Sequence, residues 1–163
     1  MDHTCCFTGH RPQVLPWRFQ ERDPRCQDLK LRLNQAILQA VQERQVCRFL
    51  SGMALGVDIW AAEAVLALSS QYPVVLDCVL PCRDQAVRWR PEDQRRYREI
   101  LTRCHQVICL QERYTPDCFD LRNRYMVDHS DLMIAVWNGS PSGTGKTIAY
   151  ARSKSLPIQL LRP

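Results

Sequence analysis

The sequence has no apolar run that approaches the ~20 residues a helix needs to cross a lipid bilayer. Its opening residues, Met-Asp-His-Thr-Cys-Cys, lack the basic flank and apolar core of a secretory signal. Internal repeats, low-complexity stretches and linkers are also missing. We therefore expect a cytoplasmic protein with no membrane partner, folded as a single domain over residues 1–163.

The Cys-x-x-Cys pattern of metal and redox sites does not occur, although cysteine is abundant. The nine cysteines are odd in number, and several, such as Cys5, Cys6 and Cys78, lie in apolar runs. In a reducing compartment, a free cysteine behaves as a small buried hydrophobic residue. We therefore predict structural thiols, no metal site and no cofactor.

Acidic residues are the minority charge, with 17 Asp and Glu against 22 Lys and Arg, which gives a net charge of +5. Much of the excess falls in predicted helices, as in Arg95-Arg96-Tyr97-Arg98, and is typical of a solvated helix face. The alternative is a stripe that binds nucleic acid, which requires the charges to gather on one face of the fold.

Strand and helix patterns alternate along the whole chain. Short apolar runs predict strands at 3–8, 46–51, 74–80, 106–110, 132–137 and 157–161. Apolar spacing and capping residues predict helices at 28–43, 59–68, 91–103, 121–128 and 146–154. Apolar strands joined by helices favour a mainly parallel sheet with helices on both faces. The predicted fold class is therefore α/β, a Rossmann-like three-layer α/β/α architecture.

Glycine is scarce, and every glycine follows a predicted strand. The six glycines, behind the first, second and fifth strands, are Gly9, Gly52, Gly56, Gly139, Gly143 and Gly145. Open α/β sheets bind ligands at this edge, where the strand order reverses. Glycine lets the backbone approach a ligand, and helix N-termini favour phosphate. We predict one pocket for a phosphate-bearing, nucleotide-type ligand; the alternative is that the glycines serve turns and caps alone.

Polar residues beside these glycines supply groups that suit phosphate and ribose. Asp58 is a candidate acceptor for ribose hydroxyls, with the N-cap of the following helix as its alternative role. Ser140 stands where a P-loop requires its first glycine, so a P-loop triphosphatase is not favoured. The predicted ligand-binding residues are Thr8, Gly9, Arg11, Ser51, Gly52, Gly56, Asp58, Ser142, Gly143, Thr144, Gly145, Lys146 and Thr147.

Three segments resemble the SLOG superfamily, named for the DNA-processing protein Smf/DprA and the cytokinin-activating LOG enzymes. Residues 51–58, Ser-Gly-Met-Ala-Leu-Gly-Val-Asp, resemble the Ser-Gly-x-Ala-x-Gly-[Ile/Val]-Asp motif of DprA. Residues 142–149 resemble the later Gly-[Ser/Thr]-x-x-Thr-Ala loop. Residues 7–12, Phe-Thr-Gly-His-Arg-Pro, are similar to the start of the small YpsA-like branch. The resemblance implies a Rossmann-like fold that binds a nucleotide-derived ligand, as a sensor or regulator.

The resemblance also implies a LOG-like hydrolase as an alternative. LOG enzymes hydrolyse the N-glycosidic bond of nucleoside monophosphates with an Arg and a Glu. Arg122 falls where that Arg is expected, whereas Thr147 occupies the Glu position. Asp58 and Glu63 are then the candidate carboxylates for a phosphoribohydrolase-like reaction.

DprA-like binding of single-stranded DNA is the second alternative. Sites of that kind combine a basic groove with aromatic side chains, for which Trp17, Trp89 and Trp137 are candidates. SLOG relatives often pair, so a homodimer is also expected, through helices with small residues such as Ala61 and Ala62.

Overall fold

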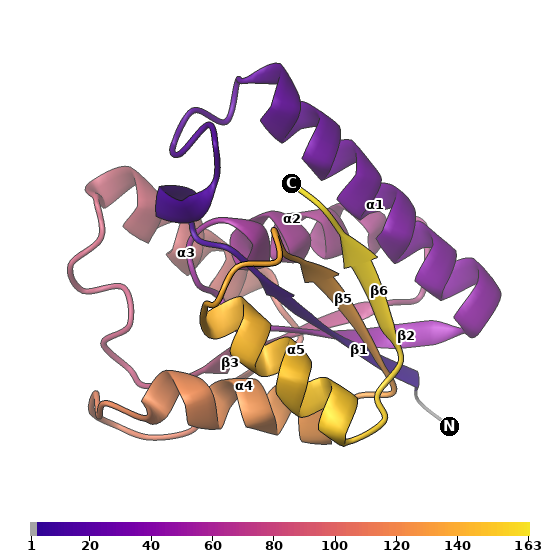
Figure 1. Ribbon diagram of the computed structural model, residues 1–163. Helices are drawn as coiled ribbons and strands as arrows, with labels where there is room; N and C mark the ends of the chain where they lie inside the picture. The colour runs from indigo at the N-terminus through magenta and orange to yellow at the C-terminus, as the bar shows by residue number, and fades with distance from the viewer. Residues whose placement is uncertain (1–2) are drawn as a thin grey trace.

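The computed structural model describes residues 3–163 and shows a twisted sheet between two layers of helices (Figure 1). The six strands are β1 His3–Gly9, β2 Val46–Ser51, β3 Val75–Leu80, β4 Gln106–Cys109, β5 Leu132–Val136 and β6 Ile158–Leu161. The helices are α1 Pro24–Arg44, α2 Val57–Leu68, α3 Pro91–Arg103, α4 Cys118–Asp128, α5 Gly143–Ser153 and a 3-10 helix at Pro12–Val14.

All six strands run parallel, in the spatial order β4-β3-β2-β1-β5-β6. The chain adds strands outward from β1 to β4 and then returns to the other side of β1 with β5. This reversal places the topological switch point between β1 and β5, whose carboxyl ends pair at Gly9 and Val136. The predicted Rossmann-like α/β class is confirmed.

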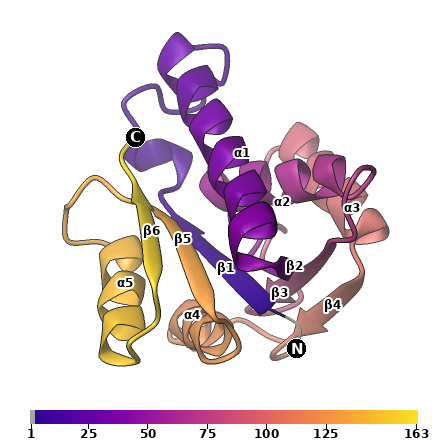
Figure 2. The same ribbon diagram turned by 90° about the vertical axis from the view of Figure 1, so that its right-hand side faces the viewer.

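The helices divide between the two faces of the sheet, as Figure 2 shows: α1, α2 and α3 cover one face, and α4 and α5 the other. This division follows from right-handed crossovers, because the chain moves across the sheet first one way and then the other. The core under the first face includes Phe7 and Phe49, whose stacked rings lie 5.7 Å apart. Met126, Met133 and Ile148 pack under the second face.

Two helices begin earlier than predicted because a side chain caps them. α1 begins four residues earlier, after Asp23, whose carboxylate accepts a hydrogen bond from the amide of Arg25 at 2.9 Å. α5 begins after Ser142, whose hydroxyl accepts one from the amide of Gly145 at 3.1 Å. Gly143 and Gly145 therefore lie in the first turn of a helix and not in the loop before it.

Helix α2 corrects two further expectations. The helix begins directly after Gly56, so the alternative that Asp58 is its N-cap is wrong. Asp58 lies in the first turn and accepts a hydrogen bond from the amide of Ala54 at 3.3 Å. Ala61 and Ala62 are fully buried against the sheet, so they are not available to a dimer interface.

Most of the cysteines belong to the core, as expected for structural thiols. The buried ones are Cys5, Cys6, Cys26, Cys78, Cys82 and Cys118. Among the helices within residues 3–163, none has the length and apolar composition required to span a membrane.

Candidate functional site

A cavity of about 390 Å³ lies at the carboxyl edge of the sheet, at the switch point between β1 and β5. Four segments form its walls: residues 7–14 at the end of β1, Ala54 and Asp58 after β2, the first half of α4, and residues 142–144 at the start of α5. Three of these segments carry the glycines that predicted the site. The fold therefore brings distant, glycine-bearing segments to one cavity.

Arg122 of α4 is a buried cation in the cavity wall, 3% exposed. Its Nη1 donates hydrogen bonds to the carbonyl oxygen of Gly52 and, at 3.3 Å, to Oε1 of Gln85, and its Nε donates to Oδ1 of Asn123 at 2.8 Å. Burial lowers the pKa of Arg122, and the nearby carboxylate of Asp58 acts in the opposite direction. Because all three hydrogen-bond partners are neutral, the charge of Arg122 remains available to an anion.

Asp58 is the carboxylate that lines the cavity, and it is 6% exposed. Its Oδ1 is buried and has no hydrogen-bond partner within residues 3–163. Burial raises the pKa of Asp58, and the positive charges of Arg122 and Arg11 partly offset this effect. An unpartnered buried oxygen is costly, so Asp58 is poised to accept a hydrogen bond from a ligand.

Phe119 of α4 lies close to two guanidinium groups. Its ring centroid is 4.9 Å from Cζ of Arg11 and 5.6 Å from Cζ of Arg122, within the range of cation–π contacts. The arrangement joins an aromatic face to positive charge, which suits a nucleobase and its phosphate. Sequence reasoning missed Phe119 because α4 was predicted to start at 121, and no glycine marks the connection before it.

The N-terminus of α5 opens onto the cavity through Ser142, Gly143 and Thr144. The hydroxyl of Ser142 caps the amide of Gly145. An α-helix provides no internal acceptor for the first amides, here those of Gly143 and Thr144. Together with the helix dipole, these donors favour an anion at this wall.

His10 joins the loops that follow β1 and β5. It is 2% exposed, and its Nε2 accepts a hydrogen bond from the amide of Asn138 at 3.0 Å. Burial lowers the pKa of His10, and only the neutral ring has the lone pair that accepts this N–H. His10 thus fixes one side of the cavity as long as the imidazole is uncharged.

Three residues of the predicted binding set after β2 shape the cavity instead of lining it. Ser51 is fully buried, and its hydroxyl donates to the carbonyl oxygen of Asp58 at 2.9 Å. Gly52 accepts the hydrogen bond from Arg122. Gly56 has φ +91°, and a Cβ there would lie 2.6 Å from the carbonyl oxygen of His10.

Three predicted residues of α5 also lie outside the cavity lining. Gly145 packs against the ring of Trp137. The side chain of Lys146 is 66% exposed and pairs with Asp120 at 3.5 Å. Thr147 is buried, and its hydroxyl donates to the carbonyl oxygen of Gly143 at 3.0 Å, so the position of the LOG glutamate carries no group that faces the cavity.

Glu63 does not join the site, contrary to the expectation for a hydrolase. Its carboxylate accepts hydrogen bonds from Nε of Arg96 at 2.9 and 3.0 Å, in a network that also contains Glu21. Of the candidate stacking residues, Trp17 is buried, 3% exposed, so it cannot stack on a base. Trp137 donates its indole N–H to the carbonyl oxygen of Ser140 at 2.8 Å.

The parallel sheet with its switch-point cavity defines an open α/β protein of the Rossmann-like class. The chain belongs to the YspA SLOG family, whose model (YpsA) matches residues 5–161. It is similar to the uncharacterized SPbeta prophage-derived protein YoqJ of Bacillus subtilis, with 29% identity over 154 residues that cover 86% of this chain and 90% of YoqJ. A UPF0398 protein of Bacillus cereus is 28% identical over 155 residues, covering 93% of this chain and 83% of the relative.

Among solved structures, the chain is similar to DNA processing protein A from Helicobacter pylori, described for its single-stranded DNA binding mode. The two superpose with a TM-score of 0.65 at 20% sequence identity, over 97% of this chain. The chain spans 64% of the length of that protein. The likeness confirms the fold, and the family match confirms the SLOG resemblance of the glycine-bearing segments.

Proposed function

We propose that the protein binds a nucleotide-derived, phosphate-bearing small molecule in the cavity between β1 and β5, as a sensor or regulator. One observation carries the proposal: the cavity combines the buried cation Arg122, whose hydrogen-bond partners are neutral, with the unpartnered Oδ1 of Asp58. A cation and an acceptor at one wall match a ligand that carries both an anion and hydroxyl groups.

The other walls extend this match. The N-terminus of α5 and the exposed Arg11 would hold the phosphate, because both offer donors and positive charge. Oδ1 of Asp58 would accept a ribose hydroxyl, and the ring of Phe119 would stack on a base. The proposal assigns no particular base.

Hydrolysis of the ligand is not part of the proposal. Glycoside hydrolysis typically requires two carboxylates, and Asp58 is the one carboxylate among the residues that line this cavity. Thr147 stands in place of the LOG glutamate, and Glu63 is engaged by Arg96. We therefore expect a bound nucleoside monophosphate to be recovered intact by chromatography after incubation.

Thermal unfolding in the presence of AMP, GMP, CMP and UMP tests the proposal. A ligand at 100 times its Kd stabilises the folded state by about 2.7 kcal/mol, which raises the Tm of a chain of this size by about 5–10 °C. Arg11→Ala removes an exposed charge of the cavity and should abolish most of the increase. Arg83→Ala is the matched control, because Arg83 is 69% exposed and pairs with Glu112 outside the cavity. If none of the four nucleotides raises the Tm, the proposal is wrong.

Binding of single-stranded DNA is a second candidate, favoured by a further cavity on the other side of Phe119. This cavity has about 520 Å³, and its lining includes the rings of Trp89 and Tyr114 together with one basic residue, Arg88, and one acidic residue, Asp84. Stacking platforms with positive charge suit a single strand. This candidate predicts an oligo(dT) affinity that falls linearly with salt on a double logarithmic scale. An affinity independent of salt would contradict it.

A further inference from the structure

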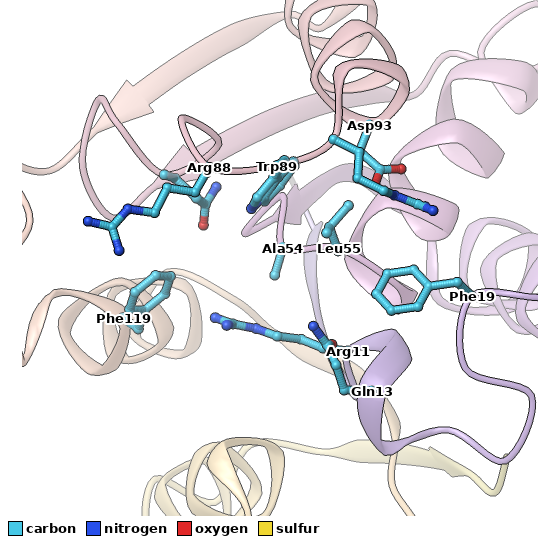
Figure 3. A pocket seen from close by; sticks show the side chains of 11 residues that line it. Arg11, Gln13, Phe19, Ala54, Leu55, Arg88, Trp89, Asp93 and Phe119 are labelled. Atoms are coloured by element: carbon cyan, nitrogen blue, oxygen red, sulfur yellow. The ribbon is translucent and has the colours of Figure 1, made fainter.

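A cavity of about 260 Å³, which we call the second cavity, opens beside the first at the same edge of the sheet (Figure 3). It is not the cavity of about 520 Å³ considered above for single-stranded DNA. The two cavities share Arg11, Gln13, Ala54 and Phe119 as walls. The far walls of the second come from the connection between β3 and α3 and from Phe19, in the segment between β1 and α1. The first cavity therefore continues into a space whose far walls come from segments that carry no glycine.

The second cavity presents a fixed aromatic surface. Trp89 lies on the wall formed by the connection between β3 and α3, apart from Phe119 and Phe19 (Figure 3). The ring of Tyr97 meets Trp89 edge-on, with centroids 5.1 Å apart and planes at 79°. Because Tyr97 is buried, this contact holds the indole in place before any ligand binds. The wall suits a planar ring.

Two cations without an ion-pair partner among residues 3–163 line the second cavity, and one of them, Arg11, also lines the first. Arg90 is neutralised by Asp93, whose carboxylate lies 3.0 Å from its Nε. Arg11 and Arg88, by contrast, form no ion pair with any acidic residue in the described range 3–163. Figure 3 shows both side chains extending toward the Phe119 side of the cavity. Two guanidinium groups so placed suit phosphate oxygens between the two cavities.

We infer that the second cavity is a subsite for the far end of an extended ligand, and that the ligand class is a dinucleotide, two nucleosides joined through phosphate. The inference rests on the proposed function, which places one nucleoside in the first cavity. Arg11 and Arg88 then hold the linking phosphates, and Trp89 stacks on the second ring. A mononucleotide fills the first cavity and leaves Arg88 and Trp89 without a contact.

Titration calorimetry with AMP and with diadenosine diphosphate, two adenosines joined through a pyrophosphate, tests this inference. We expect the dinucleotide to bind at least about tenfold more tightly than AMP, the gain of one stacked base or charge-assisted contact. Arg88→Ala and Trp89→Ala should remove that gain and leave the affinity for AMP unchanged. Arg83→Ala, in the same connection but outside both cavities, should alter neither affinity. Arg88 is exposed, so we expect Arg88→Ala to fold. This variant therefore tests the subsite even if Trp89→Ala does not fold.

Each other outcome overturns the inference in a distinct way. Equal affinities for the two probes, or an equal loss of both in Arg88→Ala, would overturn the subsite and leave the binding of AMP intact. Failure of both probes to bind would remove the proposed function together with the subsite. An oligo(dT) that binds more tightly than the dinucleotide, and loses affinity in Arg88→Ala, would assign Arg88 to a nucleic-acid strand and overturn the dinucleotide subsite.

Discussion

The guanidinium group of Arg122 donates a hydrogen bond to the carbonyl oxygen of Gly52, which lies 70 positions earlier in the chain. The approach is so close that a Cβ added at Gly52 would lie 2.6 Å from Cζ of Arg122. Glycine is therefore required here because of the arginine, and not because of a turn. The interaction holds α4 against the loop after β2 and fixes the buried cation of the cavity.

Gly52→Ala is expected to displace the guanidinium group of Arg122 and to weaken nucleoside monophosphate binding. Loss of one charge-assisted contact corresponds to about 1.5–3 kcal/mol, or at least tenfold in Kd. Titration calorimetry measures the change. A variant that binds as tightly as the unmodified protein would show that Arg122 does not contact the ligand.

Gly56→Ala is expected to destabilise the fold, because the residue has φ +91° and a Cβ would lie 2.6 Å from a backbone oxygen. The strained backbone alone costs about 1–3 kcal/mol, and the steric clash adds to it. Gly139→Ala is the matched control, since Gly139 has φ +87° with nothing within 4 Å of the added Cβ. Urea unfolding should show a clearly larger loss for Gly56→Ala; equal losses would contradict the close approach of Gly56 to His10.

Asp58→Asn is expected to stabilise the unliganded protein at neutral pH and to abolish ligand binding. Burial raises the pKa of Asp58, so between its ordinary and its raised pKa the folded state binds more protons than the unfolded state. The free energy of unfolding therefore falls as pH rises through this window. The side chain of asparagine carries no charge and does not lose this stability. The stability difference from the unmodified protein should shrink as the pH falls to about 4 and below, because the carboxyl group then becomes protonated in the unfolded state as well. Urea midpoints at several pH values measure it, and a destabilised variant at pH 7 would refute the assignment.

His10→Gln is expected to make the fold less sensitive to mild acid. Burial lowers the pKa of His10, so between the lowered pKa and its ordinary value of about 6.5 the unfolded chain binds a proton that the folded chain does not. Stability is therefore lost as pH falls from 7 to 5. Glutamine offers an uncharged acceptor to the amide of Asn138 and removes this dependence. If the two proteins lost the same free energy of unfolding between pH 7 and pH 5, His10 would not titrate in this range.

The strands and their parallel pairing could be predicted from the sequence because unbroken apolar runs between helices favour a parallel sheet, whereas the strand order came from the structure alone. The glycine-bearing segments could also be located from the sequence, because each glycine follows a predicted strand. Gly9 and Gly52 allow close approaches at the ends of neighbouring strands. The approaches themselves are to Val57 and Arg122. No local sequence pattern predicts such contacts, because they join residues far apart in the chain.

The wrong site predictions concern residues near the start of a helix. The residue at which a helix begins decides the direction of the side chains that follow it. Glu63 lies five residues beyond Asp58 on α2, which turns it by roughly 140° around the helix axis and away from the cavity. Lys146 and Thr147 were predicted to open the helix, but α5 begins at Gly143, three residues earlier, so their side chains point away from the cavity. Phe119 was missed because it stands in a first helical turn with no glycine or charge pattern beside it.

Backbone hydrogen exchange with and without AMP tests the central claim most directly, because it locates the ligand. The account predicts slower exchange in the four segments that line the first cavity, residues 7–14, 54–58, 119–123 and 142–144, with little change elsewhere. Protection confined to other segments, or no protection at a concentration of AMP that raises the Tm, would contradict a nucleotide site between β1 and β5.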